Sequence, residues 1–182
     1  MHALNKSRSC AIIVTYNPDF TALLKLIGQL KKETDFIIVD NGTLDIPYIE
    51  ESINVYNRCR EIIYLKKNEG LAKALNIGID WALSNGAKYA FLFDQDSSLC
   101  DLFVSRMISA YLDAHKKVNK ELAAVGPRII NPQTMRQTRF KVFSSIVFRS
   151  DRILSESTSH YMADFLITSG TMLNLDCIKE IG

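Results

Sequence analysis

Short apolar runs alternate with helical patterns along the first two-thirds of the chain. The runs are rich in β-branched or aromatic residues and end at Asn, Asp, Gly or Pro, which is typical of buried strands. Between them, apolar residues recur every three or four positions, which predicts amphipathic helices. The predicted strands are 10–15, 35–40, 62–65, 89–93 and 123–127. The predicted helices are 19–32, 71–85 and 101–117, with a weaker helical pattern over 45–57.

Strand and helix alternate four times, which predicts an α/β fold with an open, mostly parallel sheet and helices on both faces. Asp19 or Thr21 is available to cap the first helix. Past Pro127 the pattern loosens, and we expect one more strand over 163–168 and a helix over 175–181. The length of 182 residues fits a single domain, spanning 1–182.

Composition narrows the functional classes. A formal charge of +2 is too small to indicate nucleic-acid binding, and no apolar run approaches the ~18 residues that span a bilayer. The histidines are far apart and lack ligand spacing. The cysteines form no CxxC pair, so we expect buried free thiols in a reduced, cytoplasmic protein. The four cysteines are Cys10, Cys59, Cys100 and Cys177.

Polar residues follow each of the first four predicted strands. In a sheet of this kind, ligands bind at the carboxyl ends of the strands. Any single Asp or Asn there has an ordinary role as a turn or cap residue. However, several of these segments that follow a strand, here called exits, converge on one edge of the sheet. The four exits are Thr15-Tyr16-Asn17-Pro18, Asp40-Asn41-Gly42, Asn68-Glu69-Gly70 and Asp94-Gln95-Asp96-Ser97.

The Asp94-Gln95-Asp96 motif directly follows a buried strand. Alternate residues of an extended segment point the same way, so both carboxylates are expected to face one side. Two carboxylates beside phosphate oxygens suit Mg²⁺ or Mn²⁺. The alternative is a loop in which Asp96 or Ser97 caps the next helix.

The segment that starts at Asn68-Glu69-Gly70 forms a second motif, with Lys73 in the first turn of a helix. Gly70 lets the backbone approach a ligand, and a helix N-terminus favours anionic groups. The small residues Ala72 and Ala74 are also explained by close packing of helix on sheet. The segment matches neither a GxGxxG fingerprint nor a Walker A loop, which argues against dehydrogenases and P-loop proteins.

Taken in order, these motifs resemble family 2 inverting glycosyltransferases of the GT-A fold, and most of all bacterial rhamnosyltransferases. The resemblance covers nearly the whole chain, from about Ala11 to Gly182. It is carried by Ile13-Val14-Thr15-Tyr16-Asn17-Pro18, Val39-Asp40-Asn41-Gly42, the series Asn68, Gly70, Ala72, Ala74, Asn76 and Gly78, Phe93-Asp94-Gln95-Asp96-Ser97, Val125-Gly126-Pro127 and Ile167-Thr168-Ser169-Gly170.

The resemblance implies a role for each matched residue. Thr15, Tyr16 and Asn17 would line the base and ribose, and Asp40 would accept a hydrogen bond from the ring N–H of uracil or thymine. Gly70 and Lys73 would lie along the nucleotide. Asp94 would approach the ribose or donor sugar and, with Asp96 as the principal ligand, bind the metal. Ser169 and Gly170 would lie at the donor–acceptor junction. Residues 10–100 would thus form the nucleotide-binding part and 123–182 an incomplete acceptor-side part.

The implied function is transfer of a sugar, with dTDP-rhamnose as the expected donor and a UDP-sugar as the alternative, to a saccharide or lipid-linked saccharide. Such transfer serves the synthesis of cell-surface polysaccharide such as lipopolysaccharide O-antigen. The cation stabilises charge on the departing diphosphate, and a carboxylate base deprotonates the acceptor, which attacks with inversion. In the family that base follows the helix that here ends at Ile181-Gly182. We therefore expect a truncated chain whose base lies beyond Gly182, and do not assign Asp164 as the base.

Three further interpretations stay open. The basic stretch from Arg128 to Arg152 is either a solvated loop or a contact with a polyprenyl-diphosphate acceptor at the inner membrane face, which would make the protein peripheral there. The chain could be a catalytically silent nucleotide-sugar-binding module. A nucleotidyltransferase also uses paired acids, but Asn17-Pro18-Asp19 differs from the glycine-rich basic loop expected after its first strand.

Overall fold

The computed structural model describes residues 9–44, 57–118, 120–131, 134–137, 140–144, 147–152 and 162–181. Its strands are β1 (Ser9–Thr15), β2 (Asp35–Asp40), β3 (Cys59–Tyr64), β4 (Tyr89–Asp94), β5 (Ala124–Val125), β6 (Phe140–Ser144), β7 (Val147–Arg152) and β8 (Met172–Asn174). Its helices are α1 (Phe20–Leu30), α3 (Leu71–Ser84), α4 (Phe103–Val118) and α5 (Leu175–Ile181). Most of the weak helical pattern predicted over 45–57 lies outside the described residues.

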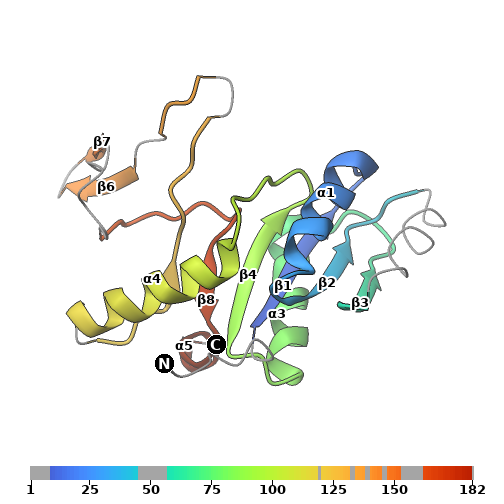
Figure 1. Ribbon diagram of the computed structural model, residues 1–182. Coiled ribbons are helices and arrows are strands. Elements are labelled where there is room, and N and C mark those ends of the chain that lie inside the picture. The colour runs from blue at the N-terminus through green and yellow to red at the C-terminus, as the bar shows by residue number, and fades with distance from the viewer. Residues whose placement is uncertain are drawn as a thin grey trace.

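Six strands form one sheet in the order β3-β2-β1-β4-β8-β5 (Figure 1). The pairs β1–β2, β1–β4 and β2–β3 are parallel, whereas β8 runs antiparallel to both β4 and β5. The chain adds β2 and β3 on one side of β1 and then places β4 on the other side, so the strand order reverses between β1 and β4. This mostly parallel arrangement confirms the predicted α/β sheet.

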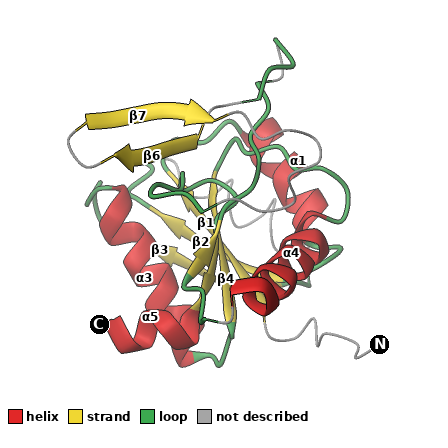
Figure 2. Cartoon of the chain, turned by 90° about the vertical axis from the view of Figure 1, so that its left-hand side faces the viewer, coloured by secondary structure: helices red, strands yellow, loops and turns green. Residues whose placement is uncertain are grey.

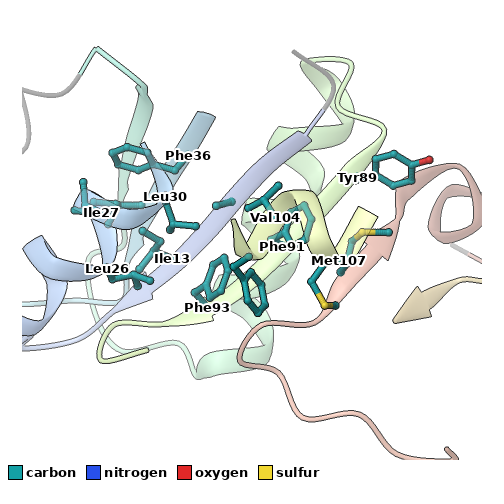
Figure 3. Packing of buried hydrophobic residues seen from close by; sticks show 14 of the residues in the cluster. Ile13, Leu26, Ile27, Leu30, Phe36, Tyr89, Phe91, Phe93, Val104 and Met107 are labelled. Atoms are coloured by element: carbon teal, nitrogen blue, oxygen red, sulfur yellow. The ribbon is translucent and has the colours of Figure 1, made fainter. Parts of the chain in front are cut away.

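Helices cover both faces of the sheet, with α1 and α4 on one face and α3 and α5 on the other (Figure 2). Side chains alternate along each strand, so Ile13 and Phe91 pack toward α1 and α4 (Figure 3). Their neighbours Ile12 and Leu92 pack in the opposite layer with α3 and α5. Burial on both faces explains why these strands are continuous apolar runs.

The first helix starts where the sequence indicates. The side chain of Asp19 accepts hydrogen bonds from the backbone N–H groups of Thr21 and Ala22. Asp19, and not Thr21, is therefore the capping residue.

The strand predicted over 163–168 is wrong. The structure instead forms β8 at Met172–Asn174, while residues 162–168 adopt no regular strand. The apolar run at 163–168 is a poor guide because Phe165 and Ile167 are about half exposed, at 55% and 47%. Beyond β5, the structure also contains a β6–β7 hairpin that the sequence pattern did not predict.

The cysteines are free thiols, as expected, but their burial differs from the expectation. Cys10 is buried in β1, whereas Cys59 and Cys177 are half-buried and Cys100 is exposed. None of the helices in the described part of the chain is long and apolar enough to cross a bilayer.

Candidate nucleotide-binding site

The parallel registers bring the ends of three central strands together. Thr15 at the end of β1 pairs with Asp40 at the end of β2. On the other side of β1, Val14 pairs with Asp94 at the end of β4. The segments that follow these strands therefore leave the sheet at the same edge, which is the edge where an open α/β sheet binds ligands.

Asp40 is fully buried, and its carboxylate forms hydrogen bonds with the end of β1 and with the residues that follow β2. Its Oδ2 atom accepts hydrogen bonds from the hydroxyl groups of Thr15 (2.9 Å) and Thr43. Its Oδ1 atom accepts from the backbone N–H groups of Gly42 (3.2 Å) and Thr43 (2.8 Å). Four donors from the chain thus satisfy this carboxylate. The contact with a nucleobase, implied by resemblance, stays a prediction and would require one of these donors to leave.

Thr43 also connects Asp40 to the segment after β1. Its hydroxyl oxygen accepts a hydrogen bond from the backbone N–H of Asn17 (3.0 Å), which has a positive φ of 45°. Tyr16 and Asn17 are exposed, whereas Thr15 is fully buried. Of the three residues predicted to line the nucleotide, Tyr16 and Asn17 are therefore accessible to a ligand, and Thr15 supports them through Asp40.

Asn41 and Asn68 tie the exits of β2 and β3 together. The amide of Asn41 donates to Asn68 Oδ1 (3.1 Å), and Asn41 Oδ1 accepts from the backbone N–H of Glu69 (2.9 Å). Gly42 lies against this exit with a φ of 94°, and a Cβ atom there would be 2.5 Å from the backbone carbon of Lys67. Only glycine allows so close an approach in that conformation.

Helix α3 begins at Leu71, and its N-cap residue Gly70, which lies beside these paired asparagines, has a φ of 90°. No side chain caps the helix, so its first turn keeps backbone N–H groups available for an anion. The space around Gly70 is open, which means that its conformation, and not crowding, requires glycine. Lys73 is exposed, and its ammonium pairs with Glu69 (2.8 Å), which lowers the pKa of that carboxyl group.

The Asp94-Gln95-Asp96 motif is a turn and not the extended segment predicted from the sequence. Asp94 ends β4, and the backbone N–H of Ser97 donates to the carbonyl oxygen of Asp94 (3.1 Å). The reasoning from strand alternation was therefore wrong. The charge of Asp96 still acts on its neighbour: partial burial, and then this charge, raise the pKa of Asp94.

The alternative that Asp96 or Ser97 caps the next helix is not realised. Helix α4 begins only at Phe103. The buried Glu33 instead binds its first turn, accepting from the backbone N–H (3.0 Å) and hydroxyl (2.9 Å) of Ser105. Asp96 is exposed, so its carboxylate is available to a ligand.

The segment before β8 completes this edge. Gly170 donates its backbone N–H to the carbonyl oxygen of Leu92 (2.7 Å), which places Ser169 beside the motif. The hydroxyl groups of Ser97 and Ser169 are hydrogen-bonded to each other. Gly170 has a φ of 82°, and a Cβ atom there would be 2.8 Å from Pro127. The predicted junction residues therefore lie next to the paired carboxylates.

Sequence reasoning missed several residues that build this site. Thr43 follows an Asn-Gly turn and carries no motif of its own. Gln95 lies inside the motif, but nothing in the sequence indicates that its side chain binds the backbone of Tyr16. Gln29 lies far away in the sequence, so only the fold reveals its contact with Leu99.

The carboxylates of Asp94 and Asp96 fit the chemistry of a divalent ion that also binds a diphosphate. Their mutual repulsion is what a cation would relieve. Among the described residues, no group of three or more His, Cys, Asp and Glu side chains gathers into a complete metal cage. Hard cations bound to nucleotides commonly take one or two carboxylates and fill the remaining positions with phosphate oxygens and water.

Residues 10–165 match the family model described as Glycosyl transferase family 2. Because this match covers most of the chain, the protein belongs to glycosyl transferase family 2. The family was predicted from the motifs and is confirmed. It does not favour the alternative of a silent binding module.

Two characterised relatives align with almost all of the chain. The dTDP-rhamnosyl transferase RfbF of Shigella flexneri is 28% identical over 172 residues, which are 94% of this chain and 55% of that protein. The galactofuranosyltransferase GlfT1 of Mycolicibacterium smegmatis is 24% identical over 184 residues, or 95% and 58%. The chain thus spans little more than half the length of these relatives.

Solved structures share the fold at lower identity. The mannosyltransferase PcManGT from Pyrobaculum calidifontis, solved with GDP-Man and Mn²⁺, superposes with a TM-score of 0.64 at 13% identity, covering 98% of this chain and 48% of that one. TarS from S. aureus, solved with UDP, gives a TM-score of 0.62 at 17% identity, covering 96% and 48%. These likenesses confirm the GT-A fold.

Proposed function

We propose that this chain carries the nucleotide-sugar site of an inverting glycosyltransferase that uses dTDP-rhamnose. The observation that supports this proposal most directly is that Asp94 and Asp96 follow β4 at the same edge of the sheet as the exposed residues Tyr16 and Asn17 and the uncapped N-terminus of α3. The similarity to a dTDP-rhamnosyl transferase favours rhamnose as the sugar. The similarity to a galactofuranosyltransferase makes a UDP-sugar the second candidate.

Different residues of the chain contact different parts of the nucleotide sugar. Tyr16 and Asn17 contact the base and ribose from the end of β1, and the first turn of α3 faces the nucleotide's negative charge. Lys73 releases Glu69 to approach the nucleotide. Ser169, held by Ser97, borders the sugar and the acceptor hydroxyl. Since inversion requires attack from the face opposite the leaving group, the acceptor approaches from the side of residues 162–170.

Asp96 and Asp94 would hold Mg²⁺ or Mn²⁺, which supplies positive charge to the departing nucleoside diphosphate when bound. Asp96 is the better ligand because its side chain is exposed and can reach an incoming ion. Asp94 is more costly to ionise in its half-buried position, and a cation would lower that cost.

Calorimetric titration with dTDP, with and without Mn²⁺, tests the site. Wild-type affinity is expected to rise with Mn²⁺, and Asp96→Ala is expected to remove at least about tenfold of that affinity, or ~1.4 kcal/mol. Asp101→Ala, which removes an exposed acid from the same loop, is the matched control. A dTDP affinity that responds neither to Mn²⁺ nor to Asp96→Ala would exclude the metal role.

The donor is tested separately by measuring how well dTDP-rhamnose and UDP-galactofuranose each displace dTDP from the protein. We expect dTDP-rhamnose to displace dTDP at lower concentration. A preference for UDP-galactofuranose would contradict rhamnose as the donor and leave the binding-site proposal intact.

We further propose that the acceptor is linked to a lipid and that this edge of the protein contacts an anionic membrane surface. Among the described residues, the large apolar side chains that are well exposed all lie in segments at the sheet edge where the site forms. They are Tyr16, Leu44, Leu71, Leu102, Ile130, Met135, Met162, Phe165 and Ile167.

Charge supports the same contact. Residues 128–152 contain six Arg and Lys residues and one Asp, although the whole chain has a formal charge of only +2. Both views draw residues 128–131 and 134–137 and the strands β6 and β7 above the sheet, on the side where β4 ends (Figures 1 and 2). Each basic residue near an anionic lipid surface contributes about 1 kcal/mol of attraction.

Sedimentation with vesicles tests the membrane contact. Binding to vesicles that contain phosphatidylglycerol is expected to exceed binding to phosphatidylcholine vesicles and to weaken with salt. Arg136→Gln and the pair Met135→Ser with Met162→Ser should each reduce binding several-fold. Lys25→Gln, which removes an exposed charge from α1, should not. Equal binding to both kinds of vesicle would contradict the proposal.

A further inference from the structure

Gln95 connects the metal motif to the segment that follows β1. The backbone N–H of Tyr16 donates to Gln95 Oε1 (2.8 Å), and Gln95 Nε2 donates to the carbonyl oxygen of Tyr16 (3.3 Å). The backbone pairing of β1 with β4 ends one step earlier, at Val14 and Asp94. The side-chain amide therefore replaces the next backbone step of the sheet, at the point where the chain turns away.

The rest of the loop is held by other parts of the fold. Gln29 of α1 binds the backbone of Leu99 in the same two-bond manner, with its Nε2 donating to the carbonyl oxygen (2.6 Å) and its Oε1 accepting from the N–H (3.2 Å). Ser97 is hydrogen-bonded to Ser169. Gln29 and Ser169 fix the loop in place, but neither of these bonds reaches the exposed segment at Tyr16.

We propose that Gln95 is a positioning residue that couples nucleoside binding at Tyr16 and Asn17 to divalent-cation binding at Asp94 and Asp96, so that each ligand raises the affinity for the other. This inference rests on the proposed function.

The coupling follows from the geometry of the amide. Because Gln95 is bonded to both polar groups of one residue, ordering of Tyr16 by a nucleoside also orders Gln95 and the carboxylates on either side of it. Ordering that benefits a second ligand produces positive cooperativity, and such coupling acts equally in both directions. Glutamine does this without adding charge, whereas an acid or a base here would alter the field between Asp94 and Asp96.

The test compares the affinity for dTDP with and without Mn²⁺ in wild type and in Gln95→Met, which has a similar length but cannot form the two hydrogen bonds. The readout is the dissociation constant of dTDP without Mn²⁺ divided by the dissociation constant with Mn²⁺. The Met variant is expected to lower this ratio about five- to tenfold, in the range of typical coupling between sites. A general loss of folding would weaken both affinities and leave the ratio unchanged. Gln95→Leu replaces the Met variant if that variant does not fold.

Gln29→Met is the matched control, because it releases the same loop without touching Tyr16. Its ratio should stay within about twofold of wild type, well below typical coupling factors. An equal fall in both variants would assign the coupling to general rigidity of the loop and overturn the role of Gln95.

Thymidine gives an independent readout because it has no phosphate to touch the ion. At a concentration that displaces dTDP, thymidine should raise Mn²⁺ affinity in wild type but not in Gln95→Met. Mn²⁺ affinity that thymidine leaves unchanged in wild type would overturn the coupling. If wild-type dTDP affinity does not respond to Mn²⁺, the proposed metal site fails. If wild type and Gln95→Met respond equally, only the role of Gln95 fails.

Discussion

At the scale of single residues, the two acids at the ends of β2 and β4 have opposite surroundings. Asp40 is buried but accepts four hydrogen bonds from its own chain, which compensate the cost of removing it from water. Asp94 is half-buried beside Asp96, and these surroundings raise its pKa. Asp40 thus serves the architecture, while Asp94 retains a charge that the protein alone does not stabilise. Functional sites often contain such destabilised groups.

Asp94→Asn is therefore expected to raise the free energy of unfolding of the ligand-free protein while weakening Mn²⁺-dependent binding of dTDP. In wild type the native state holds the Asp94 proton to higher pH than the unfolded chain does, so stability falls as pH rises through that window. The advantage of the Asn variant should be largest at neutral pH and vanish below the usual Asp pKa of about 3.9, where Asp94 is neutral in both states.

Denaturant unfolding at several pH values measures this difference. Asp101→Asn, at an exposed position in the same loop, is the control and should change stability little. An Asp94→Asn protein less stable than wild type at neutral pH would show that the Asp94 carboxylate has a stabilising partner in the native state.

At the scale of elements, two helical glycines have different reasons to be there. Gly78 of α3 faces β1, and a Cβ atom at this position would clash with Cγ2 of Ile12. Gly28 of α1 has no atom within 4 Å of such a Cβ. Close packing therefore requires glycine in α3, whereas α1 carries the helix penalty of glycine without a packing gain.

Gly78→Ala is expected to destabilise the protein by about 1–3 kcal/mol through overpacking, despite the better helix propensity of alanine. Gly28→Ala is expected to stabilise it by about 0.5–1 kcal/mol, because alanine favours the helix and restricts the unfolded chain. Each serves as the control for the other in thermal unfolding. A stabilising Gly78→Ala would mean that α3 can move away from β1 at little cost.

At the scale of the whole molecule, the two apolar layers keep the centre of the sheet out of water. Cys10 lies in the layer between the sheet and α3, and burial raises the pKa of its thiol to about 12. Burial likewise raises the pKa of Cys59 in β3 to about 11. Cys100 lies exposed in the loop that follows Asp94-Gln95-Asp96. Thiol reactivity therefore distinguishes the core of the sheet from the edge at which β4 ends.

Iodoacetamide at about pH 8 is expected to alkylate Cys100 of the native protein quickly and Cys10 only after unfolding, since the thiolate is the reactive form. Between the usual thiol pKa and about 12, the native state keeps a proton on Cys10 that the unfolded chain loses. Stability should therefore fall as pH rises through this window. Mass spectrometry of labelled peptides, with guanidinium-unfolded protein as the control, identifies each site. Rapid native labelling of Cys10 would show that β1 opens readily.

The sequence by itself determined the layers of the fold and the edge at which the polar residues after its strands gather. Strands covered on both faces must be apolar throughout, so β1, β2 and β4 are visible as continuous runs that end at polar residues. Right-handed strand–helix alternation makes those strands parallel, and parallel strands deliver their exits to one edge. That is why Asp40, Gly70 and Asp94 could be placed together from the sequence.

Only the tertiary structure decided how these residues are used. The apolar run at 163–168 predicts a strand, but the sheet accepts β8 instead, and the segment before it brings Ser169 to Ser97. The burial of Asp40 and the bonds from Gln95 to Tyr16 join segments far apart in sequence. Hydrogen bonds between distant segments depend on the final packing of strands and loops, and leave no periodic pattern in the chain. The sequence thus predicted the edge at which these residues gather, and the fold determined which of their carboxylates are exposed to solvent.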